Sequence, residues 1–260
     1  MTPVATAPDM LLCVFGVILR HDAVVKSPAG APPIITTVAE YVGQAAIRVS
    51  ATQLGVTYSR ADAKRIVAEW CRFFSRPSPI LELHFTSRTP KRLFEALAGQ
   101  PQLRRLRVKW GDYDELDALA GMVNLTDLTL GGASSVRSLD PLARLRRLER
   151  LHIESLRYVR DLSPLRHLTL VTDLEVGGDW RSPRIAHVAS IAFLADMPQL
   201  RDLVLHSMIV DSLDYAPLLQ LPHLENLRVM KARGMRPRWE ELVESFPALR
   251  GPHEHSQDAD

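Results

Sequence analysis

Apolar residues recur along this chain with a spacing that changes within each period. From Leu125 the next apolar positions are Leu128 and Leu130, three and five residues later. The same arrangement returns every 22 to 29 residues. The residues equivalent to Leu125 are Ile80, Leu103, Leu125, Leu148, Val171, Leu200, Leu224 and Leu249. A period in the twenties that contains L-x-x-L-x-L is typical of a solenoid, in which each repeat forms one coil.

Two local periods within each repeat predict two kinds of structure. The spacing of two at the end of L-x-x-L-x-L predicts a short strand with alternate side chains directed into the core. We predict these strands to be centred near Leu83, Leu106, Leu128, Leu151, Leu174, Leu203 and Leu227. Apolar residues six and three positions before each of the last six markers predict a helical or 3₁₀ return on the other side of the core. Residues 89–99 have Pro90 near their start and Gly99 at their end and predict a true helix, whereas Pro141 and Pro164 favour 3₁₀ returns.

These repeats resemble those of leucine-rich repeat proteins over roughly residues 77–250. The forms Leu-Asp-Pro-Leu at 139–142 and Leu-Ser-Pro-Leu at 162–165 resemble the compact repeats of internalins and of a phosphatase regulatory subunit. The resemblance implies an α/β fold, a right-handed leucine-rich repeat solenoid of about seven repeats. Its parallel sheet would be concave, its helical or 3₁₀ side convex, and its two ends would carry helical caps. The family is a scaffold for many tasks, so the resemblance says more about fold than about function.

One feature departs from the family pattern. The family usually has Asn or Cys just past each strand. This chain has Gly111, Ala133, Leu156, Asp179, Met208 and Ala232 there. Without that side-chain hydrogen-bonding ladder, we expect the turns to differ from repeat to repeat.

The ends of the chain differ from the repeats. We expect residues 1–33 to be poorly anchored and residues 34–76 to form a helical N-terminal cap. That cap would hold a helix at 38–49 after the Thr37 and Glu40 capping box, and another at 60–74 after Ser59. A separate effector module is the alternative for this region. Residues 77–236 would form the repeats, 237–250 a C-terminal cap and 251–260 a disordered tail.

Composition narrows the functional classes. A chain of 260 residues with 46% hydrophobic residues has enough apolar side chains for one continuous core. Its net charge of +2 argues for neither a nucleic acid nor a membrane as partner. Cys13 and Cys71 are the two cysteines and form no C-x-x-C pair; whether they bridge stays open. The apolar run at residues 10–19 is too short to span a bilayer, and we predict a cytoplasmic location. Arginine and alanine enrichment indicates a bacterial origin.

Side chains between the inward leucines form rows across the predicted sheet. The first row alternates in sign over five strands and predicts a ladder of ion pairs. It comprises Glu82, Arg105, Asp127, Arg150, Asp173, Asp202 and Asn226. Arg105, Arg107 and Lys109 on one strand form a basic patch beside Trp110. This patch is either a site for a carboxylate or phosphate of a partner or a solvated face.

A second candidate surface lies where the strands end. Double glycines at 131–132 and 177–178 remove side chains there, and we expect them to leave open surface. The second pair opens the longest repeat, whose extra residues carry aromatic and basic side chains typical of binding hot spots, although an aromatic there could equally cover the edge of the coil. We predict that the residues binding a partner protein are Trp180, Arg181, Arg184, His187, Trp110, Tyr158, Arg105, Arg107, Lys109, His152, Glu154, Gly131 and Gly177.

The sequence contains no phosphate-binding glycine loop, nucleophile motif or helix-borne metal motif. A group of acidic and histidine side chains could in principle hold a metal or serve in acid–base chemistry. It comprises His152, Glu154, Asp173, Glu175, Asp202 and His206. Pairing between rows explains these charges equally well. We therefore predict a non-enzymatic protein-binding scaffold without cofactor or metal. The alternatives are a sensor or regulatory subunit of a larger complex and, less favoured, a hydrolase or metal-binding protein.

Overall fold

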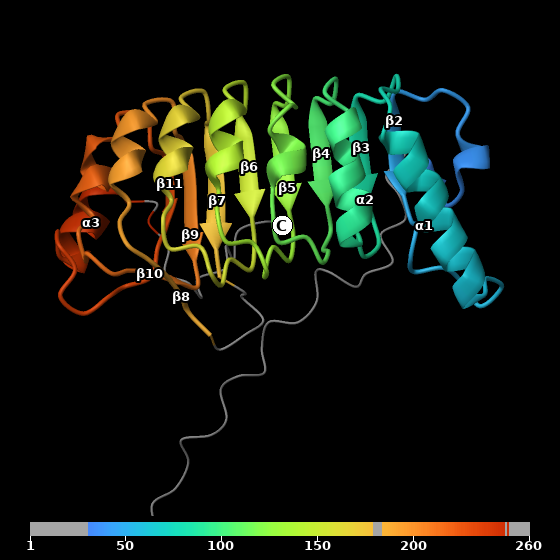
Figure 1. Ribbon diagram of the computed structural model, residues 1–260. Coiled ribbons are helices and arrows are strands. Elements are labelled where there is room, and N and C mark those ends of the chain that lie inside the picture. The colour runs from blue at the N-terminus through green and yellow to red at the C-terminus, as the bar shows by residue number, and fades with distance from the viewer. Residues whose placement is uncertain (1–30, 179–183, 248, 250–260) are drawn as a thin grey trace, which may run out of the picture. The chain divides into compact units, whose positions relative to one another are not determined.

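A parallel sheet of nine strands is the framework of the chain (Figure 1). The computed structural model describes residues 31–178, 184–247 and 249. The chain divides into two units, 1–32 and 33–260, and the sheet belongs to the second. In spatial order its strands are β1 (Ile34–Ile35), β2 (Ala46–Val49), β3 (Glu82–Phe85), β4 (Arg105–Val108), β5 (Asp127–Leu130), β6 (Arg150–Ile153), β7 (Asp173–Gly177), β9 (Asp202–His206) and β11 (Asn226–Arg228). Strand order therefore follows chain order, as it does when each repeat adds one coil to a stack.

Helical returns cover one face of this sheet (Figure 1). They are α1 (Arg60–Phe74), α2 (Lys91–Glu95), η2 (Ala96–Gly99), η3 (Asp117–Leu119), η4 (Asp140–Arg144), η5 (Ser163–His167), η6 (Ala192–Asp196) and η7 (Ala216–Gln220). The return expected to be a true helix begins as α2 and ends in the 3₁₀ segment η2. The returns containing Pro141 and Pro164 are 3₁₀ helices, as predicted. We call the opposite side of the sheet the open face, because none of these returns lies on it.

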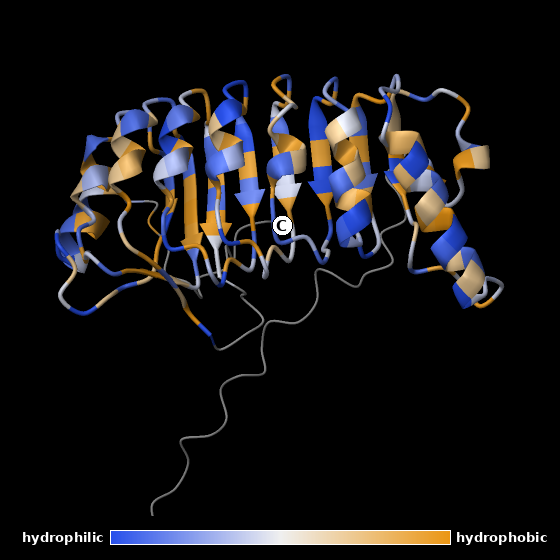
Figure 2. Ribbon diagram, in the orientation of Figure 1, coloured by the Kyte–Doolittle hydropathy of each residue, from blue (hydrophilic) through white to orange (hydrophobic). Residues whose placement is uncertain are grey.

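The predicted register of the strands is confirmed. The central leucines Leu83, Leu106, Leu128, Leu151, Leu174, Leu203 and Leu227 stand opposite one another in successive strands. None of them is more than 2% exposed. Hydrophilic and hydrophobic positions alternate along the strands (Figure 2), since successive side chains of a strand point to opposite faces. One continuous apolar core therefore runs between the sheet and the returns.

The expected helix at 38–49 is wrong. The Thr37 and Glu40 capping box is present, but it opens only the 3₁₀ helix η1 (Val38–Glu40). Gly43 then takes a positive φ of 95°, and residues 46–49 form β2. In β2 the side chains of Ile47 and Val49 are buried, and the alternation continues that of β3. The region 34–76 thus contributes two strands to the sheet besides α1.

The helix expected at 60–74 is confirmed as α1. Ser59 caps it by accepting a hydrogen bond from the backbone N–H of Asp62. Trp70 and Phe74 are fully buried on its inner side and their rings stack at a centroid distance of 5.1 Å. The Trp70 indole N–H donates to the backbone oxygen of Thr36 at 2.8 Å. Since α1 also packs against α2 and η2, it is part of the stack of returns.

Strand exits use backbone hydrogen bonds between coils where the family has a side-chain ladder. At equivalent turn positions Gly132, Ser155 and Ser207 take positive φ values of 64°, 65° and 48°. The N–H of Ala133 donates to the oxygen of Glu154 at 2.9 Å, and the N–H of Leu156 to that of Gly177 at 2.9 Å. The backbone N–H groups of Ala133 and Leu156 are thereby satisfied without an asparagine.

Two smaller elements complete the described chain. Strands β8 (Ala186–Val188) and β10 (Met208–Val210) pair in parallel as a second sheet. The helix α3 (Trp239–Ser245) occupies part of the predicted C-terminal cap. Within the described residues, no helix combines the length and the apolar character that crossing a membrane requires.

Candidate protein-binding surface

The first row of the open face is a ladder of ion pairs over four strands. Nη1 of Arg105 lies 3.3 Å from Oε1 of Glu82, and Nε of Arg105 lies 3.7 Å from Oδ2 of Asp127. Arg150 pairs with the other side of the Asp127 carboxylate. Among the described residues the ladder does not continue from Arg150 to Asp173, which instead lies 3.1 Å from His152 Nε2. Arg105 is thus neutralised by its neighbours.

The neighbouring rows carry a basic surface, which we define as Arg48, His84, Arg107 and Lys109. Arg48, His84 and Arg107 stand opposite one another on β2, β3 and β4. Arg107 and Lys109 are exposed, and within the described chain neither makes an ion pair. His84 is half-buried on β3, between Arg48 of β2 and Arg107 of β4. Its burial, followed by the charges of Arg107, Arg48 and Lys109, lowers its pKa to about 4.

Farther along the open face the charges reverse. Glu175 of β7 is half-buried, with Oε2 at 4.0 Å from His152 Nδ1 and Oε1 at 3.5 Å from His206 Nε2. Burial raises the pKa of the Glu175 carboxyl; His152 opposes that effect, and the carboxylates of Glu154 and Asp173 add to it. Within the described residues, no three His, Cys, Asp or Glu side chains are placed so that they could hold a metal ion. The histidines of this group lie beside carboxylates of neighbouring strands.

The glycines at the strand exits correct one expectation. Gly131 and Gly177 are buried, and neither leaves open surface for a partner. A Cβ on Gly131 would stand 2.2 Å from the backbone oxygen of Lys109, and one on Gly177 would stand 2.3 Å from that of His206. The missing side chains allow neighbouring coils to approach each other. We therefore remove both glycines from the proposed contact surface.

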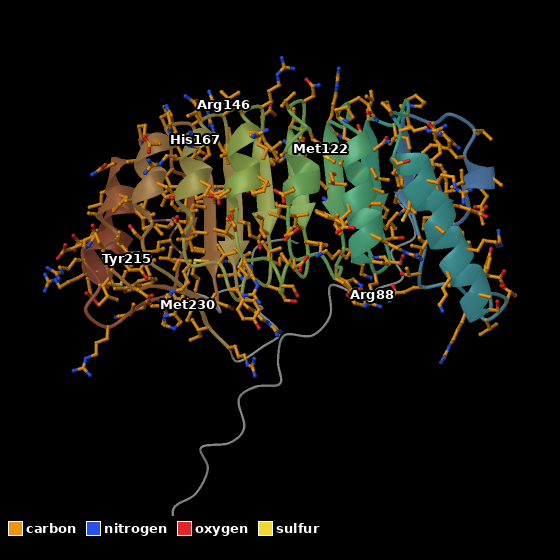
Figure 3. The ribbon with its side chains drawn as sticks, in the orientation of Figure 1. Arg88, Met122, Arg146, His167, Tyr215 and Met230 are labelled. Carbon is orange, nitrogen blue, oxygen red and sulfur yellow. The ribbon has the colours of Figure 1, made fainter. Side chains whose placement is uncertain are left out.

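Two exposed aromatic residues lie beyond the ends of β4 and β6, each beside an arginine. Trp110 is 38% exposed, with the Arg88 guanidinium 5.9 Å from its ring centroid. Tyr158 is 57% exposed, with the Arg137 guanidinium 5.2 Å from its ring. Arg88 lies at the edge of the sheet where the strands end, the lower edge in Figure 3. In both cases the arginine comes from the preceding coil and holds the ring by a cation–π contact. We call Trp110 and Tyr158 the aromatic edge.

His187 lies on β8, and its Nδ1 is 2.7 Å from Asp211 Oδ1. Arg160 pairs with the other oxygen of Asp211. The hydrogen bond from His187 and then the charge of Arg160 lower the pKa of the Asp211 carboxyl. Arg184 is exposed just before β8, while Trp180 and Arg181 lie outside the described residues.

Sequence patterns missed Arg88, Arg137 and Asp211. All three lie in the connections between strands and returns, whose lengths vary from repeat to repeat. No period therefore predicts which of their side chains meet.

Solved structures provide the comparison for this fold. No protein-family model and no curated protein sequence matches the chain. An internalin, InlF from Listeria monocytogenes, has a TM-score of 0.54 at 16% identity, over 81% of this chain and 54% of its own. Internalin C2 from the same species has a TM-score of 0.45 at 19% identity, over 66% of this chain and 75% of its own. The ectodomain of the receptor kinase GASSHO1/SCHENGEN3 from Arabidopsis thaliana has a TM-score of 0.38 at 16% identity, over 58% of this chain and 22% of its own.

Of these three structures, only InlF has a TM-score above 0.5, and this chain spans about half of its length. The likeness concerns the fold: parallel strands joined by short helical returns in a solenoid. The chain is thus a leucine-rich repeat protein in its architecture. Its repeats are internalin-like, as residues 139–142 and 162–165 predicted.

Proposed function

We propose that the chain is a non-enzymatic scaffold that binds another protein in a bacterial cell. The observation that carries this proposal is the open face, a nine-stranded surface of charged rows that the helical returns leave uncovered. A long rigid surface suits a macromolecule better than a small substrate, which needs a concave pocket. The resemblance of the fold to internalins is compatible with this class but does not supply the partner.

The partner would dock along the aromatic edge and onto the adjoining open face. Trp110 and Tyr158 would act as apolar anchors, since exposed aromatics held in place by arginines lose little freedom on binding. Arg184 and His187 would contribute polar contacts near β8. Trp180 and Arg181 remain predicted members of this surface from the sequence.

Capture of the partner tests this function. The tagged full chain and the double variant Trp110→Ala/Tyr158→Ala would be used to capture proteins from the bacterium of origin. The matched control is Leu170→Ala, since Leu170 is also exposed, by 49%, but precedes β7 and so lies at the edge where the strands begin. We expect one stoichiometric partner to be retained by the control. The double variant should lose it, because an anchor residue contributes about 2 kcal/mol or more, about thirtyfold in affinity.

Melting temperatures of all variants separate binding from folding. A partner that the folded double variant binds as tightly as the wild type would contradict docking at the aromatic edge. Trp180→Ala belongs in the same series. If it unfolds the protein but leaves the affinity of the folded fraction unchanged, Trp180 covers the edge of the coil and does not contact the partner.

A further inference from the structure

The open face has opposite charges at its two ends. The basic surface occupies β2 to β4. Glu154, Asp173, Glu175 and Asp202 lie on or just past β6, β7 and β9. Cations are present in this second region too: Arg150 pairs with Asp127, and His152 and His206 lie beside Glu175 and Asp173. The charge of Arg228 on β11 also acts on Glu175 and opposes the rise of its pKa, so that carboxylates outnumber free cations here only in part of the region, around Glu154, Asp173 and Glu175. The first strands therefore present positive charge and this part of the later strands negative charge.

Two cations of the basic surface, Arg107 and Lys109, have no carboxylate partner within the described chain. Arg105 on the same strand has two carboxylate partners, Glu82 and Asp127, whereas Arg107 and Lys109 have no ion pair in the described part of the protein. Arg107 stands directly opposite His84 in the register, and neighbouring strands lie about 4.8 Å apart. The pKa of His84 is lowered first by its burial and then by these neighbouring cations. His84 is therefore neutral at pH 7, and the positive charges of Arg107 and Lys109 would attract carboxylates from outside the chain.

Resting on the proposed protein-binding function, we propose that Arg107 and Lys109 bind a short acidic segment of the partner protein, next to the anchor at Trp110. The basic surface spans three strands, about 10 Å between the outer two, which matches about four residues of extended chain. A long polyanion such as nucleic acid would continue over Glu154 and Glu175 and be repelled there. The complementary partner therefore has a short acidic run, and residues that are neutral or basic a few positions away.

Two peptides of identical composition test this assignment. The first has four glutamates, a three-residue Gly-Ser spacer and three lysines. The second has the same residues with glutamate and lysine alternating. Fluorescence anisotropy at low ionic strength would measure the affinity of each peptide for the full chain. We expect the block peptide to bind about fivefold or more tightly than the alternating one, since only its separated charges match both ends of the open face.

Variants with equal charge loss locate the site. Arg107→Gln/Lys109→Gln removes the proposed contacts, and Arg144→Gln/Arg146→Gln removes the same charge elsewhere. Arg146 lies at the edge of the sheet opposite Arg88 (Figure 3), and both control residues are exposed. We expect the first pair to weaken binding of the block peptide about fivefold or more and the second pair less than twofold.

Several outcomes would overturn the proposal. One is equal binding of the two peptides, and another is equal loss in the two double variants, which would indicate non-specific attraction. Displacement of the block peptide by inorganic phosphate, but not by chloride at matched ionic strength, would indicate a site for small anions. If a captured partner depends on the aromatic edge but not on Arg107 and Lys109, the protein-binding function stands and this inference fails.

Discussion

Gly177 of β7 lies so close to His206 of β9 that a side chain between them has no room. An added Cβ would stand 2.3 Å from the His206 carbonyl oxygen and 2.7 Å from two atoms of its ring. The two residues are direct partners in the parallel register. The glycine therefore sets how closely two coils approach at the strand exits, beside the turn at Ser207.

Gly177→Ala is expected to lower the free energy of unfolding by about 1–3 kcal/mol, because the obstacle includes a backbone oxygen, which cannot rotate away. Urea unfolding of the purified chain measures this. Gly121→Ala is the control, since a Cβ there meets no atom within 4 Å, and we expect a change within about 0.5 kcal/mol. Equal stability of the two variants would show that the coils separate at this position at no cost.

Leu151→Ala tests the register of the whole solenoid. Leu151 is fully buried at the centre of β6, and its truncation should cost about 2–5 kcal/mol through lost contacts and a cavity. Leu219→Ala on the return η7 is the matched control, because Leu219 is 48% exposed. A loss below about 1 kcal/mol for Leu151→Ala would place that residue outside the core, contrary to the repeat register.

Sequence reasoning succeeded where the period was long and repeated. Seven strands were predictable because residues such as Leu128 and Leu130 alternate inward in every repeat, and the prolines indicated 3₁₀ returns. It failed at 38–49, where the spacing of apolar residues fits a helix as well as the alternation that Ile47 and Val49 follow in β2. The pairing of β2 with β3 decides between the two, and a local pattern does not contain that pairing.

The candidate surface was predictable to a smaller extent. The rows of the open face follow directly from the register, so the Arg105 and Asp127 pairing was foreseeable. The cation–π contact of Arg137 with Tyr158 was not, because the two residues stand seven and five positions past their strands and so are not equivalent in the repeat. The environment of Gly177 was misjudged because the sequence does not show that the backbone of the next coil occupies the space.

The ion pair between Asp127 and Arg150 is expected to contribute about 0.2–1 kcal/mol to stability, since Arg150 is half exposed. A double-mutant cycle with Arg150→Ala and Asp127→Asn measures it. The coupling should shrink at about 1 M salt, where exposed charges are screened. Arg146→Ala, which removes an exposed arginine with no ion pair in the described residues, should change stability less. A coupling energy of zero at low salt would show that this ion pair does not contribute to the stability of the protein.

His84 gives the stability of the protein a specific dependence on pH. Its folded-state pKa of about 4 lies below the ordinary value of 6.5, so the unfolded chain binds the proton more tightly than the folded chain. The stability that comes from keeping His84 neutral is therefore fully present above pH 6.5 and is lost as the pH falls toward 4. After allowance for partial exposure, the loss is on the order of 2 kcal/mol.

Urea unfolding at pH 7 and pH 4.5, for the wild type and His84→Gln, measures this contribution. We expect the variant to lose less stability between the two pH values. The raised pKa of Glu175 acts with the opposite sign, because its folded form binds the proton more tightly, but it is common to both proteins and cancels in the difference. NMR titration of the His84 ring gives the pKa directly, and Arg107→Gln/Lys109→Gln should raise it while burial keeps it below 6.5. Titration of the wild-type ring near 6.5 would contradict both its burial and the electrostatic effect of the basic surface.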